Sequence, residues 1–252
     1  MSSAESFETR IAMLQKLIDS SSSIVFFGGA GVSTESGIPD FRSKDGLYNQ
    51  HDVRFDRYSP EYLLSHSCLV REPKVFYEFY RQKLDGRGVK PNTTHYKLAE
   101  LEASGRLSAV ITQNIDGLHQ LAGSRKVCEI HGTTLRNYCS DCGKSFDKDY
   151  IFESSDAIPR CSCGGYVRPD VTLYEESLPQ QAWIDAINAL NHADLFIIGG
   201  TSLTVYPANT LTREFHGKTL VVINRDPTPQ DKYADLVFHE SLGEVFGRLS
   251  CS

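Results

Sequence analysis

The stretch IVFFGGAGVSTESGIPDFR (residues 24–42) decides the fold class of this chain. Its first four residues form a short apolar run that is typical of a buried strand and ends at two glycines. In the turn Gly29-Ala30-Gly31, backbone N–H groups can approach a pyrophosphate, and a following helix is expected to add a favourable dipole. Thr34 stands where the dehydrogenase pattern G-x-G-x-x-G has its third glycine, so a simple tight turn is the alternative.

The segment after this turn is predicted to be a loop, because Pro39 opposes a helix and Gly37 loosens one. It carries an aromatic ring on Phe41 and a guanidinium on Arg42, next to the carboxylate of Asp40. Such a loop would help an enzyme that breaks the glycosidic bond of NAD, by covering the nicotinamide ribose and excluding water. The alternative is a surface loop with one salt bridge.

The remainder of the chain alternates strands with helices, which predicts a parallel sheet covered on both faces. Helices are expected at 5–20, 72–84, 93–104, 180–191 and 207–215, after 238, and from the N-cap Ser59-Pro60 onward. Further strands are expected at 108–112, 195–199, 219–224 and 236–238. Residues 132–166 show little periodicity and resemble a metal-stapled loop region.

Four of the seven cysteines form a tight group with the spacing of a metal site. Cys139 and Cys142 are separated by 18 residues from the pair Cys161 and Cys163, and four thiolates suit tetrahedral zinc. Four protein ligands leave no coordination position for a catalytic water, so one structural Zn²⁺ per chain is predicted. A redox pair is the competing interpretation of the first two cysteines.

These patterns predict a Rossmann-type α/β domain with a helical insertion and a small zinc-binding module. A chain of 252 residues suits one such domain with smaller modules. We expect the Rossmann-type domain to be discontinuous, at 1–42, 92–131 and 171–252. The helical module is expected at 43–91 and the zinc module at 132–170.

Composition and charge indicate which classes of partner the protein binds and in which cellular compartment it is expected. With 32 acidic and 26 basic residues the formal charge is −6, which opposes broad binding to nucleic-acid phosphates. The N-terminus lacks a secretory pattern, and no apolar run reaches the ~18 residues that a membrane span needs. We expect a cytoplasmic protein that is monomeric and binds neither membrane nor nucleic acid.

Polar residues follow two of the predicted strands. Gln113, Asn114 and Asp116 come after SAVIT (108–112), at a strand end where ligands bind in open α/β sheets. Helix capping is the alternative for each of them, above all for Asp116. His131 follows another short predicted strand, VCEI (127–130), and a neutral imidazole there can accept a hydroxyl proton. A lone histidine is more often structural, and the chain has eight.

Six blocks, in order along the chain, resemble the sirtuins, the NAD-dependent protein deacylases. They are GAGVSTESGIPDFR (29–42), TQNIDGLH (112–119), EIHGT (129–133), VRPDVTLYEESLP (167–179), GGTSLTVYPA (199–208) and VVINRD (221–226). The resemblance implies removal of acyl groups from protein lysines, with nicotinamide, O-acyl-ADP-ribose and free lysine as products. His131 would be the base, Asn114 would contact the nicotinamide ribose hydroxyls and Asp116 the nicotinamide carboxamide.

The resemblance also implies which residues contact NAD and the acyl-lysine peptide. Those for NAD are Gly29, Ala30, Gly31, Thr34, Phe41, Arg42, Gln113, Asn114, Ile115, Asp116, His131, Gly200, Thr201, Ser202, Asn224, Arg225 and Leu242. Those for the peptide are Val171, Thr172, Tyr174 and Glu175, in a stretch that pairs with the substrate by β-augmentation in sirtuins. Here Thr172 and Tyr174 replace the usual Val and Phe. Glu175 replaces a common Gly, and is expected to favour basic residues beside the target lysine.

The acyl pocket departs from the sirtuins that prefer succinyl or malonyl lysine, which carry Tyr-x-x-Arg. The matching stretch keeps Tyr80, expected in the pocket, but has Lys83 in place of Arg, with Arg81 nearby. Lysine lacks the planar fork that binds a carboxylate, so acetyl or other short neutral acyl groups are expected. The alternatives to a deacylase are a protein mono-ADP-ribosyltransferase on the same NAD fold, and a non-catalytic NAD sensor or zinc-bearing interaction module.

Overall fold

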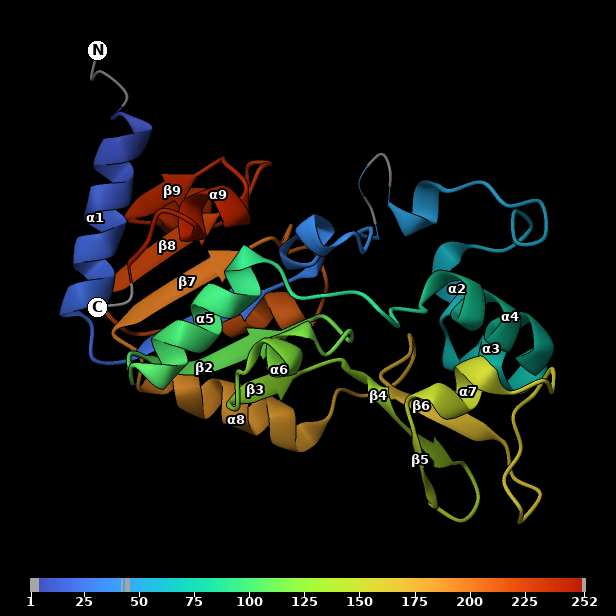
Figure 1. Ribbon diagram of the computed structural model, residues 1–252. Coiled ribbons are helices and arrows are strands. Elements are labelled where there is room, and N and C mark those ends of the chain that lie inside the picture. The colour runs from blue at the N-terminus through green and yellow to red at the C-terminus, as the bar shows by residue number, and fades with distance from the viewer. Residues whose placement is uncertain (1–4, 42, 44–45, 251–252) are drawn as a thin grey trace.

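A six-stranded parallel sheet forms the larger part of the molecule (Figure 1). The computed structural model describes residues 5–41, 43 and 46–250. The strand order is β3-β2-β1-β7-β8-β9, and every neighbouring pair is parallel. The strands are β1 (Ile24–Gly28), β2 (Leu107–Thr112), β3 (Val127–Glu129), β7 (Leu195–Gly199), β8 (Thr219–Ile223) and β9 (Leu236–Phe238).

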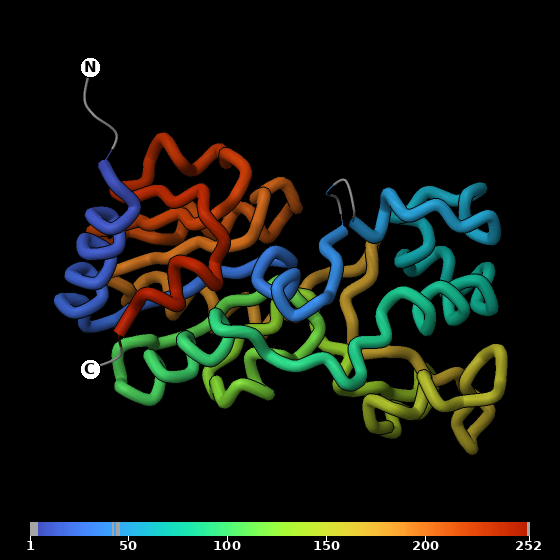
Figure 2. The backbone as a smooth tube through the Cα atoms, turned by 45° about the horizontal axis from the view of Figure 1, so that its top comes forward, coloured from blue at the N-terminus to red at the C-terminus, as the bar shows by residue number. Residues whose placement is uncertain are grey.

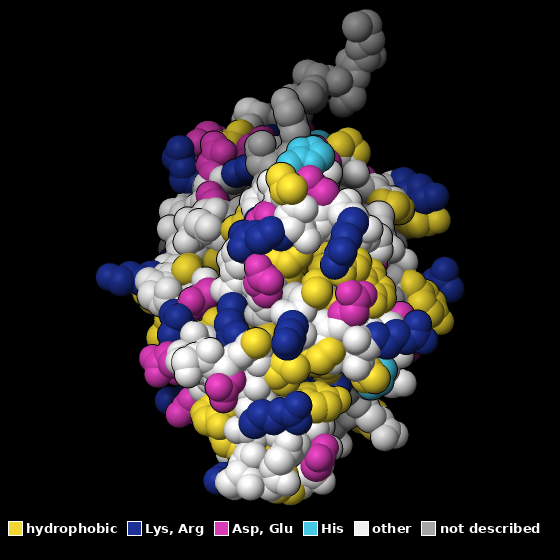
Figure 3. Space-filling view, turned by 90° about the vertical axis from the view of Figure 1, so that its right-hand side faces the viewer, with side chains coloured by type: hydrophobic (Ala, Val, Ile, Leu, Met, Phe, Trp, Pro, Cys, Tyr) yellow, Lys and Arg dark blue, Asp and Glu magenta, His cyan; other side chains and the backbone are white. Residues whose placement is uncertain are grey.

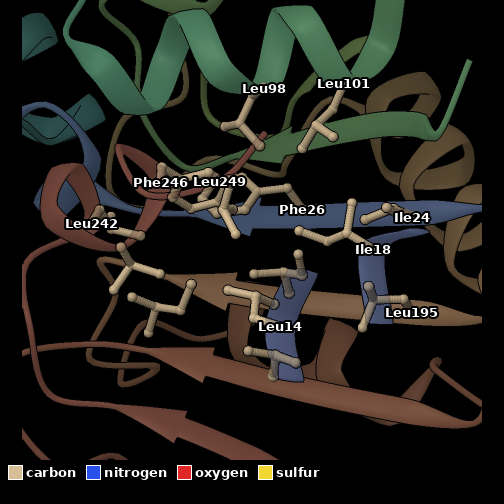
Figure 4. Packing of buried hydrophobic residues seen from close by; sticks show 14 of the residues in the cluster. Leu14, Ile18, Ile24, Phe26, Leu98, Leu101, Leu195, Leu242, Phe246 and Leu249 are labelled. Carbon is tan, nitrogen blue, oxygen red and sulfur yellow. The ribbon is translucent and has the colours of Figure 1, made fainter. Parts of the chain in front are cut away.

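Strand β1 lies inside the sheet and sends its side chains alternately to two cores. Ile24 and Phe26 join the core under α1 (Phe7–Ser20), α5 (Thr93–Ala103) and α9 (Leu242–Phe246), whose packing is visible in Figure 4. Val25 and Phe27 face the opposite core, which α8 (Gln180–Asn191) covers. All four side chains are fully buried, so the strand is apolar at every position, as the sequence predicts.

The helical and zinc-binding parts of the chain lie together at one end of this sheet (Figures 1 and 2). The helices are α2 (Pro60–Leu63), α3 (His66–Arg71) and α4 (Pro73–Lys83), and Ser59 caps α2 as expected. Beside them a three-stranded antiparallel sheet has the order β5-β4-β6, with α7 (Asp149–Glu153) packed on it. Its strands are β4 (Gly132–Cys139), β5 (Ser145–Asp147) and β6 (Val167–Val171), and α6 (Leu118–Ala122) precedes them in the chain.

The fold class predicted from the sequence is confirmed, with three local corrections. The turn after β1 continues as 3₁₀ turns at Ala30–Val32 and Thr34–Ser36, and no α-helix follows it directly. The helix expected at 207–215 is a 3₁₀ helix at Ala208–Arg213. Residues 132–166 hold β4, β5 and α7, because short antiparallel strands with bulges leave little periodicity in the sequence.

The outer face of the helical and zinc-binding parts carries mixed charge. Figure 3 shows lysine and arginine side chains interspersed with aspartate and glutamate across this face. Within the described residues, no helix has the length and apolar character needed to cross a membrane.

Candidate active site

A cavity of about 630 Å³ opens at the carboxyl ends of four parallel strands. Gly29 follows β1, Gln113 follows β2, Gly200 follows β7 and Asn224 follows β8, and all four line it. The helical module closes the far side through Leu47, Leu64 and Lys83 among others. Such a position outside the strand ends is where open α/β sheets bind ligands.

Almost all residues that the sequence assigns to NAD and peptide line this one cavity. They are Gly29, Ala30, Gly31, Thr34, Phe41, Gln113, Asn114, Ile115, Asp116, His131, Val171, Thr172, Tyr174, Glu175, Gly200, Thr201, Ser202, Asn224, Arg225 and Leu242. Arg42 lies outside the described residues, and Tyr80 does not line the cavity. The roles of the lining residues stay predictions, whereas their convergence is a property of the fold.

The glycine turn packs directly on the loop that follows β7. The Gly31 amide donates a hydrogen bond to the Gly200 carbonyl at 2.9 Å. A Cβ added to Gly31 would lie 2.7 Å from the Gly200 Cα, so only glycine permits this approach. The close contact brings the two loops to the same wall of the cavity, where a dinucleotide needs exposed backbone and polar groups.

Ser33 joins two of the predicted catalytic residues. Its hydroxyl donates to the Asp116 carboxylate at 2.7 Å and accepts from the Asn114 amide nitrogen at 3.0 Å. Asp116 also accepts from the amide of Leu118, the first residue of α6, at 2.9 Å, while the N-cap position itself is held by Gly117. Burial raises the pKa of the Asp116 carboxyl, although the Leu118 amide and the Ser33 hydroxyl oppose the rise. The sequence analysis did not single out Ser33, although its position within the stretch 29–42 could have indicated a role in the site.

His131 is held in one orientation by the backbone. Its Nδ1 lies 3.0 Å from the Gln113 carbonyl oxygen, and a carbonyl can only accept, so Nδ1 is the protonated nitrogen. In the neutral ring, Nε2 is then the nitrogen that can accept a proton. The backbone amide of Thr172 donates to the His131 carbonyl at 2.9 Å, so the backbone of His131 is bonded to the predicted peptide-binding stretch.

The prediction that Tyr80 lines the acyl pocket is wrong. Its side chain is fully buried in the helical module and stacks between the rings of Phe76 and Phe152. Position 83 is the one that faces the cavity, and the Lys83 ammonium donates to Gln50 at 3.1 Å. Arg81 turns away and donates to the carbonyls of Ile151 and Asp156. Residues three apart share a helix face, so the difference comes from position along the helix. Lys83 is the last residue of α4 and lies beside the cavity, whereas Tyr80 lies nearly one turn earlier and is packed in the core.

The four grouped cysteines meet at the junction of β4, β6 and their connecting loop. All four sulfurs lie within 4.8 Å of one another, with Cys139 and Cys163 3.4 Å apart and Cys142 and Cys161 3.7 Å apart. Tetrahedral zinc with bonds of about 2.3 Å places its sulfurs about 3.8 Å apart. The four thiols therefore fit a structural zinc ion, and their convergence favours the metal site over a lone redox pair.

Several cavity residues escaped the sequence analysis. Glu35 accepts hydrogen bonds from the Ser241 hydroxyl and the Gly243 amide, and so joins the 3₁₀ turns to the start of α9. Val205 and the largely exposed Tyr206 also line the cavity. Only the tertiary packing brings these residues to the cavity, because each belongs to a loop whose local pattern is that of an ordinary turn.

Comparison with known proteins agrees with this geometry. The model of the Sir2 family matches residues 29–207. The NAD-dependent protein deacetylase of Clostridium acetobutylicum is 53% identical over 237 residues, which are 94% of this chain and 96% of that protein. The protein of the same name from Cutibacterium acnes is 56% identical, over 90% of this chain and 92% of that one.

A solved structure supports the same relationship. It is described as Sir2 bound to acetylated peptide, has a TM-score of 0.83 and 36% identity, and covers 94% of this chain and 96% of its own. The similarity thus extends over the sheet, the helical insertion and the four-cysteine module alike. On the family match over residues 29–207 and the identity to these relatives over nearly the whole chain, the chain belongs to the Sir2 family, the sirtuins.

Proposed function

We propose that this protein removes acetyl or other short neutral acyl groups from lysine side chains of proteins, with NAD as co-substrate. The observation that carries the proposal is the shared cavity. The glycine turn, the Ser33–Asn114–Asp116 network and the oriented imidazole of His131 all line it. The relatives from Clostridium acetobutylicum and Cutibacterium acnes, which carry the name of this activity, support it.

Bound NAD would supply a ribose carbon that takes up the acyl oxygen as nicotinamide leaves, and a ribose hydroxyl that receives the acyl carbon as the lysine nitrogen leaves, with one water molecule replacing the oxygen left on the ribose carbon. The chain's own residues orient and protect these groups. His131 Nε2 accepts the proton of the hydroxyl, since Nδ1 is engaged by the Gln113 carbonyl. Asn114 and Asp116 orient the nicotinamide end, and the loop that carries Phe41 covers it from water.

The acyl-lysine is proposed to enter along residues 171–175, which continue β6 past the cavity. A peptide can add there by backbone hydrogen bonds, as an extra strand. Zinc held by the four cysteines would be structural, because it has four protein ligands and lies in a separate module. A monomer in the cytoplasm, acting on acyl-lysine proteins, remains our expectation for the cellular form.

The decisive test incubates the purified protein with an acetyl-lysine peptide, with and without NAD, and follows products by mass spectrometry. Nicotinamide and O-acetyl-ADP-ribose should appear in step with the free lysine. Free acetate formed equally without NAD contradicts the proposal. Transfer of ADP-ribose to the peptide, with the acetyl group retained, indicates the transferase alternative instead.

A further inference from the structure

The stretch that follows β6 is joined to the helical module by a series of hydrogen bonds. The Tyr174 amide donates to the Leu64 carbonyl at 3.0 Å, and the His66 amide donates to the Tyr174 carbonyl at the same distance. The His66 ring lies 3.0 Å from the Glu176 carboxylate. Residues 174–176 and 64–66 therefore form one short parallel contact, although they belong to different parts of the chain.

Glu175 sits in the middle of this contact with an unusual backbone. Its φ is +74°, a left-handed conformation that strains any residue with a Cβ and that glycine adopts without cost. Its carboxylate accepts a hydrogen bond from the Ser67 amide at 2.9 Å. The pKa of Glu175 is lowered, chiefly because the Ser67 hydroxyl and then the Ser67 amide donate to the carboxylate. The side chain is thus directed at α3, in a residue that is exposed as a whole.

This arrangement bears on the cavity, because both partners of the contact line it. Leu64 contributes from the helical module, and Tyr174 and Glu175 contribute from the opposite strand. The width of the cavity at this end therefore depends on how firmly the two segments are held together. A glycine at position 175 would let the strand move away from the helical module, because it removes the side chain that bonds to Ser67 and allows more backbone conformations.

We propose that Glu175 is a positioning residue that holds the peptide-binding stretch 171–176 against Ser67 of the helical module, and so shapes the site for the acylated lysine. This inference rests on the proposed function for the identity of the bound peptide. It differs from the role expected from the sequence, in which the Glu175 charge attracts basic residues beside the target lysine. The two roles separate experimentally, because a hydrogen-bond acceptor can be kept while the charge is removed.

Glu175→Gln keeps an oxygen that can accept from Ser67, whereas Glu175→Ala and Glu175→Gly remove it. For the alanine variant we expect the KM for an acetyl-lysine peptide to rise at least about fivefold, the effect of a single lost hydrogen bond, since both Ser67 donors lose their acceptor, with kcat and the KM for NAD within about twofold. Glu175→Gln should stay close to wild type. Ser67→Ala should show part of the effect, and combining it with Glu175→Ala should add less than the sum of the two.

Peptides with basic and with acidic flanking residues complete the assay. An unchanged peptide KM in Glu175→Ala overturns the proposal. So does a Glu175→Gln variant that loses affinity for the basic peptide as strongly as the alanine variant, because charge would then be the determinant.

Amide hydrogen exchange provides a readout that needs no activity. The amides of His66, Ser67 and Tyr174 should exchange faster in Glu175→Ala than in wild type, and at wild-type rates in Glu175→Gln. If the variants differ from wild type in exchange as expected but the wild-type protein does not deacylate the peptide, the proposed function fails and the positioning role stands. If exchange at these amides is the same in all variants, the positioning role fails whatever the activity.

Discussion

The Nδ1 atom of His131 and the carbonyl oxygen of Gln113 are 3.0 Å apart, although the residues are 18 positions apart in the chain. The parallel register of the sheet causes this proximity, because Thr112 of β2 lies opposite Glu129 of β3. The residues that leave these two strands therefore emerge side by side. The resulting hydrogen bond selects the tautomer in which Nε2 accepts a proton.

Substituting His131 by alanine should slow deacylation by a factor of ~10²–10⁴, as the loss of a general base does. NAD affinity should change much less, because most of the residues expected to contact NAD, including the glycine turn and the loop after β7, are unchanged in this variant. Turnover and NAD binding should be measured on the same preparation. His192→Ala, at the exposed end of α8, is the matched control. A His131→Ala turnover within a few-fold of wild type would remove the residue from its proposed role.

Zinc content should fall from one ion per chain to nearly none in Cys139→Ser and in Cys163→Ser. Both should also unfold at lower temperature, since metal binding contributes to folding where a module has little core of its own. Elemental analysis and thermal unfolding measure the two effects. Cys128→Ala, whose sulfur lies outside the four-cysteine group, should keep its zinc. Folded and active wild-type protein without zinc would contradict this prediction.

Acetyl-lysine should be removed with higher kcat/KM than succinyl-lysine on matched peptides. A succinyl carboxylate loses its hydration in the cavity, and Lys83 offers it a point charge without the two parallel hydrogen bonds of arginine. Lys83→Arg should therefore raise relative activity on succinyl-lysine. Lys90→Arg makes the same change at an exposed position outside the cavity and should have no effect. An unchanged acyl ratio in Lys83→Arg would show that position 83 does not contact the acyl group.

Stability should decrease as the pH falls below about 6.5, because of two buried histidines. The rings of His95 and His119 have centroids 4.8 Å apart, and burial lowers their pKa values to about 4 and about 3. Between these values and about 6.5 the unfolded chain binds more protons than the folded one, so acid favours unfolding. The slope should reach at most ~1.4 kcal/mol per pH unit for each histidine.

Urea unfolding at pH 7.5, 6.0 and 5.0 measures this dependence. Neither ring nitrogen of His119 has a hydrogen-bond partner among the described residues, so His119→Leu should reduce the slope while costing little at pH 7.5. Equal stability of the wild type at pH 7.5 and 5.0 would contradict the assignment. The same slope in wild type and His119→Leu would place the proton uptake elsewhere.

The sequence alone determined the parallel sheet and most of the site. Apolar runs such as 195–199 and 219–223 are short and alternate with helical stretches, which indicates buried strands, and the bounds of α8 and β7 agree with those predicted. The cysteine spacing and the glycine turn carry chemistry in their residue types, so they could be recognised without coordinates. Family resemblance then assigned the residues that the fold brings to one cavity.

Tertiary structure alone decided which side chains of α4 face the cavity, and which backbone conformation and hydrogen-bond partner Glu175 has. Tyr80 belongs to the core and Lys83 to the cavity because packing against α7 and β6 sets the position of the helix, which residue spacing cannot specify. The left-handed backbone of Glu175 and its bond to Ser67 depend on a segment more than a hundred residues away. Local sequence determines which contacts a residue is able to make, and long-range packing selects among them, because the free energies of the competing local conformations differ by only a few kcal/mol.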